Sequence, residues 1–300
     1  MKNGGSMSHN SPFDLDSGDV WQRWRDQKLE MAPTSLESLL VEIDDPRTIR
    51  QVEHDAVIDS CRRANMAIYV SPLQEEGTHI PRAVGMRFGL NNIDHNRGAE
   101  QDAVTALTVQ EDEGHARYIP YTNREIHWHT DGYYNRLDLQ DHAMLLHCVR
   151  PAMRGGENGL MDHEMAYLLM RESHPEYVEA LMREDAMVIP AHEVEGEEMR
   201  PVRGGPVFMV TAAGRLHMRY TMRKRNIRWN QDPLVQAAVA WLENLLKSDS
   251  EYIFHGTLQP GWGLIANNVL HDRTGFEDSE DPGQKRLLYR ARYHDRIHCT

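Results

Sequence analysis

Cysteine, positive charge and long apolar runs are all scarce in this 300-residue sequence. The three cysteines, Cys61, Cys148 and Cys299, are widely spaced, which argues against a disulfide framework or a cysteine-rich zinc site and fits a reducing compartment. Lys and Arg number 33 against 46 Asp and Glu, so the net charge of −13 lacks the basic field that nucleic-acid binding needs. No apolar run approaches the ~20 residues of a membrane span.

These absences indicate the expected location and partners of the protein. Residues 1–12 are polar and rich in Gly, Ser and Asn, unlike a signal peptide, and we expect them to form a disordered leader. We expect residues 13–300 to form a single domain of a cytoplasmic protein that has no nucleic-acid or membrane partner. A symmetric homo-oligomer is the default expectation for its assembly.

Histidine, by contrast, is abundant, with 17 residues. Hydrophobic residues at 40% and charged residues at 26% are ordinary for a globular protein that buries a real core. Because histidine serves both as a metal ligand and as an acid or base near neutral pH, the search for function begins with metal sites and acid/base sites.

Short β-rich runs separated by polar turns dominate the chain, and they predict a fold that is mainly β with helical decoration. Helical spacing of apolar residues and N-terminal capping signals predict the helices between these runs. Strands are expected at 66–70, 106–109, 143–149, 207–210, 216–220, 263–267 and 286–293. Helices are expected at 19–31, from Pro46 to Cys61, after Asp162, after Pro175 and after Asp232.

One segment, 126–132, combines two histidines with an aspartate in the sequence Ile-His-Trp-His-Thr-Asp-Gly. In a strand with period two, His127, His129 and Asp131 would share one face. An imidazole and a carboxylate at this spacing are two thirds of the facial triad of non-haem Fe(II) oxygenases. Taken alone, the triplet is better explained by a solvated strand end.

Two downstream features complete the pattern. His271 follows the apolar run 263–267 and is the best candidate for a third metal ligand. Arg286, Arg290 and Arg292 would share one face of the last strand, which requires either a matching anion or an edge position with that face in water. A guanidinium is suited to grip a carboxylate with two hydrogen bonds.

Four ordered segments together resemble the taurine dioxygenase family (TauD/TfdA-like) of Fe(II)/2-oxoglutarate-dependent oxygenases. The resemblance begins near Arg47 and reaches the C-terminus, and it implies a double-stranded β-helix, the jelly-roll or cupin-like core. The segments are Trp128-His-Thr-Asp131, Gly155-Gly-Glu-Asn158, Asn268-Val-Leu-His-Asp-Arg-Thr274 and Gln284-Lys-Arg-Leu-Leu-Tyr-Arg290.

The resemblance also implies a role for each matching residue. His129, Asp131 and His271 would bind Fe(II), and Arg286 would pair with the distal carboxylate of 2-oxoglutarate. Asn158 stands where the family commonly has a threonine that contacts the same carboxylate. Two further residues are candidates for substrate binding: Arg290, which matches a family arginine on the substrate's anionic group, and Tyr133 at the entrance. The resemblance implies no catalytic residue beyond the metal ligands, and His127 would serve only in packing or in support of the ligands.

The implied function is an oxidoreductase, a dioxygenase that uses Fe(II), 2-oxoglutarate and O2. It would hydroxylate an aliphatic C–H bond of a small, anionic molecule and release succinate and CO2. One alternative is a non-redox metal lyase or isomerase on a cupin-like scaffold, which has no need of Arg286 as an anchor. Another is a non-catalytic binding protein, in which we would expect loss of at least one ligand.

Overall fold

The computed structural model describes residues 11–95, 103–110, 119–194 and 197–300. The predicted leader, 1–12, lies outside these residues except for its last two. The chain divides into two compact units, which are described separately. Whether residues 13–300 act as a single domain therefore stays a prediction. Within the described residues, no helix is both long and apolar enough to cross a membrane.

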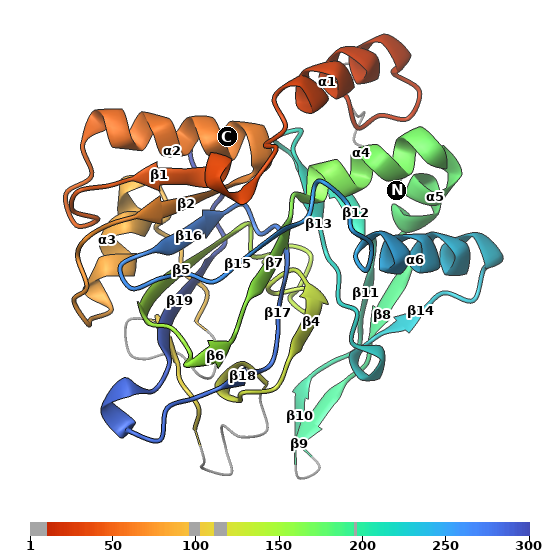
Figure 1. Ribbon diagram of the computed structural model, residues 1–300. Helices are drawn as coiled ribbons and strands as arrows, with labels where there is room; N and C mark the ends of the chain where they lie inside the picture. The colour runs from red at the N-terminus through yellow and green to blue at the C-terminus, as the bar shows by residue number, and fades with distance from the viewer. Residues whose placement is uncertain (1–10, 96–102, 111–118, 195–196) are drawn as a thin grey trace. The chain divides into compact units, whose positions relative to one another are not determined.

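The larger unit comprises Pro33–Asp162, Arg219–Arg225 and Asp249–Thr300 and is built on two sheets (Figure 1). The six-stranded sheet has the order β1 (Leu40–Glu42), β2 (Met66–Val70), β16 (Gly263–Ala266), β5 (Ala143–Arg150), β19 (Leu287–Tyr293), β3 (Thr105–Leu107). The four-stranded sheet has the order β15 (Phe254–Gly256), β7 (Asn158–Met161), β17 (Leu270–Arg273), β4 (Ile126–His129). A two-stranded ribbon joins β6 (Arg154–Gly155) to β18 (Phe276–Glu277). These sheets form the predicted jelly-roll core.

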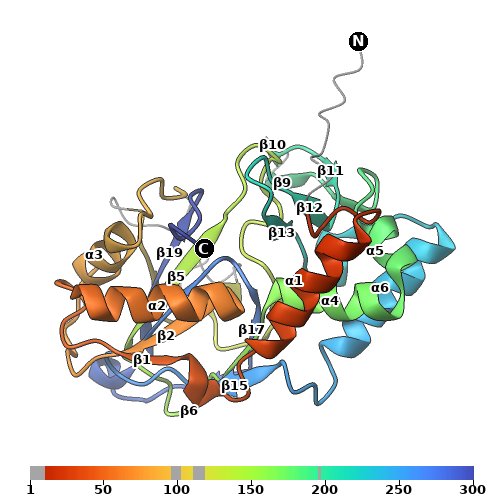
Figure 2. The same ribbon diagram turned by 90° about the horizontal axis from the view of Figure 1, so that it is seen from above.

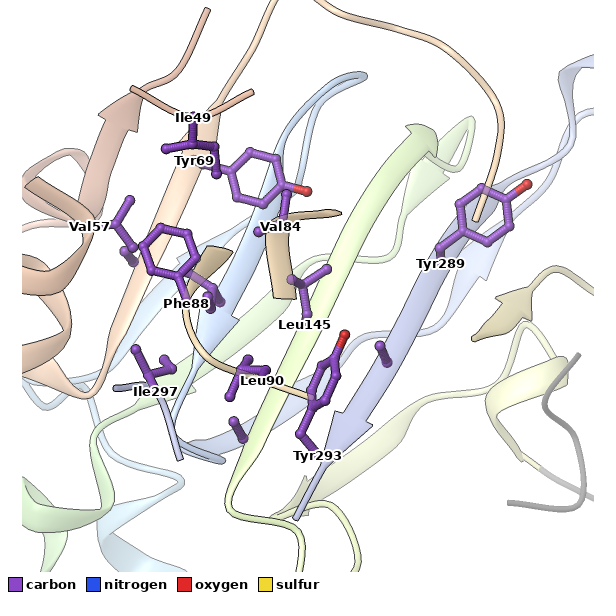
Figure 3. Packing of buried hydrophobic residues seen from close by; sticks show 14 of the residues in the cluster. Ile49, Val57, Tyr69, Val84, Phe88, Leu90, Leu145, Tyr289, Tyr293 and Ile297 are labelled. Atoms are coloured by element: carbon purple, nitrogen blue, oxygen red, sulfur yellow. The ribbon is translucent and has the colours of Figure 1, made fainter. Parts of the chain in front are cut away.

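Alternation along the buried strand β5 separates the apolar core into two layers. Leu145 belongs to a cluster that includes Val57 of α2 (Gln51–Ala64) and Val84 of α3 (His79–Arg87), and Figure 3 shows these side chains together. Both helices accordingly cover the same face of the six-stranded sheet (Figure 1 and Figure 2). Leu146 faces the other way and packs with Leu160 of β7, so the space between the two sheets is filled by side chains.

The smaller unit is mainly helical and comprises Met1–Ala32, His163–Met218 and Asn226–Ser248. Its helices are α1 (Gly18–Glu30), α4 (His163–Ser173), α5 (Pro175–Leu181) and α6 (Pro233–Leu245). Its strands are β8 (Met187–Ile189), β9 (His192–Val194), β10 (Glu197–Arg200), β11 (Arg203–Gly205), β12 (Phe208–Val210), β13 (Leu216–Met218) and β14 (Arg228–Trp229). A buried ion pair of 2.7 Å between Lys28 and Glu164 joins α1 to α4. Short 3₁₀ helices in the chain lie at Leu36–Leu39, Ile119–Tyr121, Lys224–Asn226 and Pro282–Gln284.

Most predicted elements are confirmed, but the helix expected from Pro46 is wrong at its start. It begins at Gln51, because the Glu53 carboxylate accepts the backbone N–H of Arg50 at 2.7 Å and so caps the first turn there. At α6 the predicted cap is confirmed, since the Asp232 carboxylate accepts the N–H of Leu234 at 2.8 Å.

Candidate active site

Three predicted ligands converge where β4 meets β17. His129 is directly opposite His271 in the antiparallel register, and Asp131 follows β4 in the next turn. The potential ligand atoms of the three side chains all lie within 4.8 Å of one another. The strand-alternation argument that linked them is nevertheless wrong at Asp131, because β4 ends at His129, two residues earlier.

Backbone carbonyls orient both imidazoles in the same way. His129 Nδ1 lies 2.9 Å from the carbonyl oxygen of His127, and His271 Nδ1 lies 3.0 Å from that of Val269. Each Nδ1 therefore carries the proton that it donates, which leaves each Nε2 as the atom for a metal. The backbone of His127, rather than its half-exposed imidazole, supports the ligand set.

Burial and charge hold these groups in the protonation states that metal binding needs. Burial, reinforced by the nearby imidazole of His271, lowers the pKa of His129 to about 3, so it is neutral at pH 7. Burial also disfavours ionisation of Asp131, but the positive charges of Arg290 and Arg292 outweigh it. They hold the pKa of the Asp131 carboxyl below its usual range.

The donor set fits Fe(II). Two imidazoles and one carboxylate leave three positions of an octahedral ion open, as in the facial triad. Asp131 Oδ2 is buried and has no hydrogen-bond partner in the part of the chain that the structure describes. An unsatisfied buried carboxylate oxygen is costly, and coordination to a cation would satisfy it.

The predicted arginine face is buried, so its interpretation as an exposed edge strand is wrong. β19 lies between β5 and β3, with pairing on both sides. Arg290 Nη1 lies 3.4 Å from Asp131 Oδ1. Arg292 forms ion pairs with Asp94 and Asp141. Two of the three arginines are thus already matched by carboxylates of the protein itself.

Arg286 is the exception. It is only 4% exposed, and no described carboxylate lies within 4.0 Å of its guanidinium. Its Nη1 reaches the carbonyl of Leu107 at 3.5 Å, and its guanidinium carbon lies 5.0 Å above the ring of Phe276. Burial lowers the pKa of Arg286 from its ordinary value. Asp278 accepts the backbone N–H of Arg286, but the guanidinium forms no ion pair with a described carboxylate, which fits a site for the carboxylate of a small molecule.

The predicted Gly-Gly turn leaves room beside this arginine. Gly155 and Gly156 have φ of +70° and +72°, a conformation that strains other residues. A Cβ on Gly156 would lie 3.9 Å from Arg286 Nε, so the absence of a side chain keeps space next to the guanidinium.

Asn158 and Tyr133, the two remaining predicted site residues, lie in different surroundings. Asn158 is half-buried, donates from Nδ2 to the carbonyl of Asp272 at 3.1 Å, and lines a mostly apolar hollow together with Trp262. Tyr133 is buried, its ring centroid is 5.1 Å from that of Tyr134, and its carbonyl accepts a hydrogen bond from Arg219 at 3.0 Å.

Sequence reasoning missed the segment that pairs with the other edge of β4. Thr221 bridges His129, Thr130 N–H donates to the Tyr220 carbonyl at 3.0 Å, and Met222 N–H donates to the Trp128 carbonyl at 2.9 Å. The segment 219–225 carries four basic residues, and this density of charge in an acidic chain is the signal that could have found it.

The chain is similar to several proteins of named activity. The protein is 28% identical over 200 residues to a uridine-5'-phosphate dioxygenase of a Streptomyces species, covering 65% of this chain and 70% of that enzyme. It is 30% identical over 175 residues to a second uridine-5'-phosphate dioxygenase, from an Amycolatopsis species, with 55% and 60% covered. A trimethyllysine dioxygenase of Meyerozyma guilliermondii is 30% identical over 169 residues, with 52% and 40% covered.

Solved structures show the same fold. An asparagine oxygenase in complex with Fe(II), 3-hydroxyasparagine and succinate aligns over 91% of both chains with a TM-score of 0.53 and 14% identity. The non-heme iron oxygenase OrfP in complex with Fe and alpha-ketoglutaric acid aligns over 90% of both chains with a TM-score of 0.57 and 15% identity.

A family model also matches most of the chain. The model described as "Taurine catabolism dioxygenase TauD, TfdA family" matches residues 75–292, which include all three converging ligands and the arginine strand. The family comprises dioxygenases that act on small molecules and use Fe(II), 2-oxoglutarate and O2. The chain therefore belongs to the TauD, TfdA family and is an Fe(II)- and 2-oxoglutarate-dependent dioxygenase.

Proposed function

We propose that the protein hydroxylates an aliphatic C–H bond of a small anionic molecule and releases succinate and CO2. The observation that carries the proposal is the combination of a two-histidine, one-aspartate cluster with a buried arginine whose guanidinium forms no ion pair with a described carboxylate. His129, Asp131 and His271 would hold the iron, and Arg286 would bind the distal carboxylate of 2-oxoglutarate.

The chain's own residues prepare this chemistry. When bound, Fe(II) supplies the centre at which O2 and 2-oxoglutarate react. The two Nδ1 hydrogen bonds orient His129 and His271 so that each Nε2 is available to the metal. The buried guanidinium of Arg286 gives the co-substrate a fixed end, which a lyase or isomerase on this scaffold would not require.

Charge near the site favours an anionic substrate. The side chains of Arg223, Lys224 and Arg225 form no ion pair with any described carboxylate, and they follow directly after the segment that pairs with β4. Two relatives act on a nucleotide monophosphate, by their names. A phosphate monoester such as uridine 5'-phosphate is therefore the first substrate to test, with sulfonates and carboxylates next.

Further roles complete the proposal. Arg290 and Tyr133 would contact the substrate, since Arg290 borders Asp131 and Tyr133 lies two residues beyond it. Asn158 would contact 2-oxoglutarate only if its amide donated to the co-substrate carboxylate instead of to the Asp272 carbonyl.

A cytoplasmic location and a symmetric homo-oligomer remain predictions, and light scattering on the purified chain tests the second.

The test is succinate release across a substrate panel. Wild-type protein should form succinate from 2-oxoglutarate in a manner that depends on Fe(II) and on one class of anionic substrate. Turnover of any substrate that proceeds fully without 2-oxoglutarate would favour the non-redox alternative. Release of succinate with cationic or neutral substrates alone would contradict the anionic assignment.

A further inference from the structure

We propose that Asn268 is a positioning residue that sets the separation of the two iron-binding segments by clamping the backbone of Asp131. The inference rests on the proposed ligand set and concerns how that set is held together. Asn268 belongs to the turn between β16 and β17 and lies three residues before His271.

The clamp consists of two reciprocal hydrogen bonds. Asp131 N–H donates to Asn268 Oδ1 at 2.8 Å, and Asn268 Nδ2 donates to the Asp131 carbonyl at 2.9 Å. The second hydrogen of the same amide is donated to the Asp141 carbonyl. Since Asn268 is 1% exposed, this one side chain satisfies three buried backbone groups that have little access to water.

Asp131 needs such a clamp because the strand ladder ends before it. β4 stops at His129, and its pairing with β17 ends at the His271–His129 pair, two residues before Asp131. The amide of Asn268 takes the place of the backbone partner that a longer ladder would have offered to Asp131. A carboxylate ligand in a turn would otherwise sample several positions relative to the histidines.

The backbone of Asn268 is shaped for this task. Its φ is +50°, in the left-handed region that Asn tolerates better than most residues. The next residue, Val269, accepts the hydrogen bond from His271 Nδ1 at 3.0 Å. One tight turn thus orients the His271 ring through its backbone and the Asp131 segment through its side chain.

A purely structural role is the competing explanation, and the chain contains its own control. Asn267 is equally buried, donates to Asn65 Oδ1 at 3.1 Å and to Thr300 Oγ1 at 2.9 Å, and accepts the Ile297 N–H at 3.1 Å. None of these partners is a proposed metal ligand. Loss of either amide should cost stability, but only loss of the Asn268 amide should disturb the ligands.

The experiment compares Asn268→Gly, Asn268→Asp and Asn267→Ala by Mn(II) binding to the full chain without 2-oxoglutarate. Gly keeps the left-handed backbone and removes the clamp, and Asp keeps the acceptor for Asp131 N–H while removing the donor. Thermal unfolding of the metal-free variants is measured in parallel. We expect the Mn(II) Kd to rise about 10- to 100-fold in Asn268→Gly, less in Asn268→Asp, and to stay within about twofold in Asn267→Ala.

The outcomes separate failure of the clamp from failure of the proposed iron site. Wild-type Mn(II) affinity in a folded Asn268→Gly or Asn268→Asp variant overturns the clamp alone. Equal weakening in Asn267→Ala at equal loss of thermal stability also overturns it, because the effect then follows stability. If wild-type protein and His129→Ala bind Mn(II) equally, the proposed iron site fails, and the clamp fails with it.

Discussion

Two clusters in the larger unit satisfy the same geometric criterion for a metal site, yet their carboxylates are paired with arginine side chains to different extents. Each brings three ligand atoms within 4.8 Å of one another, and the clusters are His129, Asp131 and His271, and Asp94, Asp141 and His294. In the second cluster, Arg292 pairs with both carboxylates, and its Nη1 also donates to the Tyr134 hydroxyl at 2.8 Å. The second cluster therefore already contains its cation.

The first cluster is balanced differently. Its single carboxylate meets Arg290 through one nitrogen at 3.4 Å, and Asp131 Oδ2 has no hydrogen-bond partner among the described residues. The comparison teaches that proximity of histidine and aspartate does not distinguish a metal centre from an ion-pair network. The pairing of the carboxylate oxygens with guanidinium groups does so, because Asp141 Oδ2, which also lacks a hydrogen-bond partner among the described residues, lies 3.5 Å from Arg292 Nε.

Removal of a ligand from the first cluster should have the largest effect. His129→Ala should lower 2-oxoglutarate-dependent turnover at least about 10³-fold, because loss of the metal removes several kcal/mol of transition-state stabilisation. His127→Ala is the matched control, since that imidazole is half-exposed, and it should retain near wild-type rates. Full succinate release by His129→Ala would break the distinction between the clusters.

Removal of the cation from the second cluster should affect stability instead. Arg292→Met leaves Asp94 and Asp141 without their guanidinium and should lower the free energy of unfolding by about 3–5 kcal/mol. Arg136→Met breaks an exposed pair with Asp138 and should change stability little. Urea unfolding measures both, and a stable Arg292→Met protein would contradict this assignment.

Arg286, which directly precedes β19, should affect co-substrate binding. Arg286→Gln removes the unmatched buried cation and should raise the KM for 2-oxoglutarate about 10- to 100-fold, with Mn(II) affinity unchanged. Arg150→Gln, which removes a partner of Glu76 at the end of β5, is the control. An unaltered KM in Arg286→Gln would remove the reason to separate Arg286 from Arg292.

The smallest expected effect is on the pH dependence of stability. Burial, together with the charges of Asp94 and Asp131, raises the pKa of Asp141 to about 7, although Arg292 and His294 oppose the shift. The folded state then binds more protons than the unfolded state between about pH 4 and 7, so this group's contribution to stability falls as pH rises through that window.

Asp141→Asn should remove this dependence. The melting temperature of the variant relative to wild type should rise by a few degrees from pH 4.5 to 7 and stay level above pH 7, whatever the constant offset between the two proteins. A difference that is flat across the window, or that falls with pH, would show that Asp141 is ionised in the folded state throughout.

Local patterns explain why much of the fold could be predicted from the sequence. The β-branched and aromatic run Met66–Val70 forms β2 with the expected bounds, and Asp232 with Pro233 starts α6 as expected. Both signals lie within a few consecutive residues. The family was identified for the same reason, since each motif is short and the order of the motifs survives in a single chain.

Features made by tertiary contacts could not be predicted in this way. The alternation argument placed Asp131 on the strand face of His129, but the chain leaves the strand before Asp131 and Asn268 holds it from a segment 137 residues away. Likewise, the arginine face of β19 gave no sign that Asp94 and Asp141 neutralise Arg292. Charge balance depends on partners that sequence spacing does not reveal.

Anaerobic titration of the purified protein with Fe(II) and then with 2-oxoglutarate tests the central claim most directly. If the first cluster holds iron and Arg286 anchors the co-substrate, a weak visible charge-transfer band should develop only when both are present. The band should be absent in His129→Ala and should require a higher 2-oxoglutarate concentration in Arg286→Gln. Absence of the band in wild-type protein at saturating Fe(II) and 2-oxoglutarate would contradict the account.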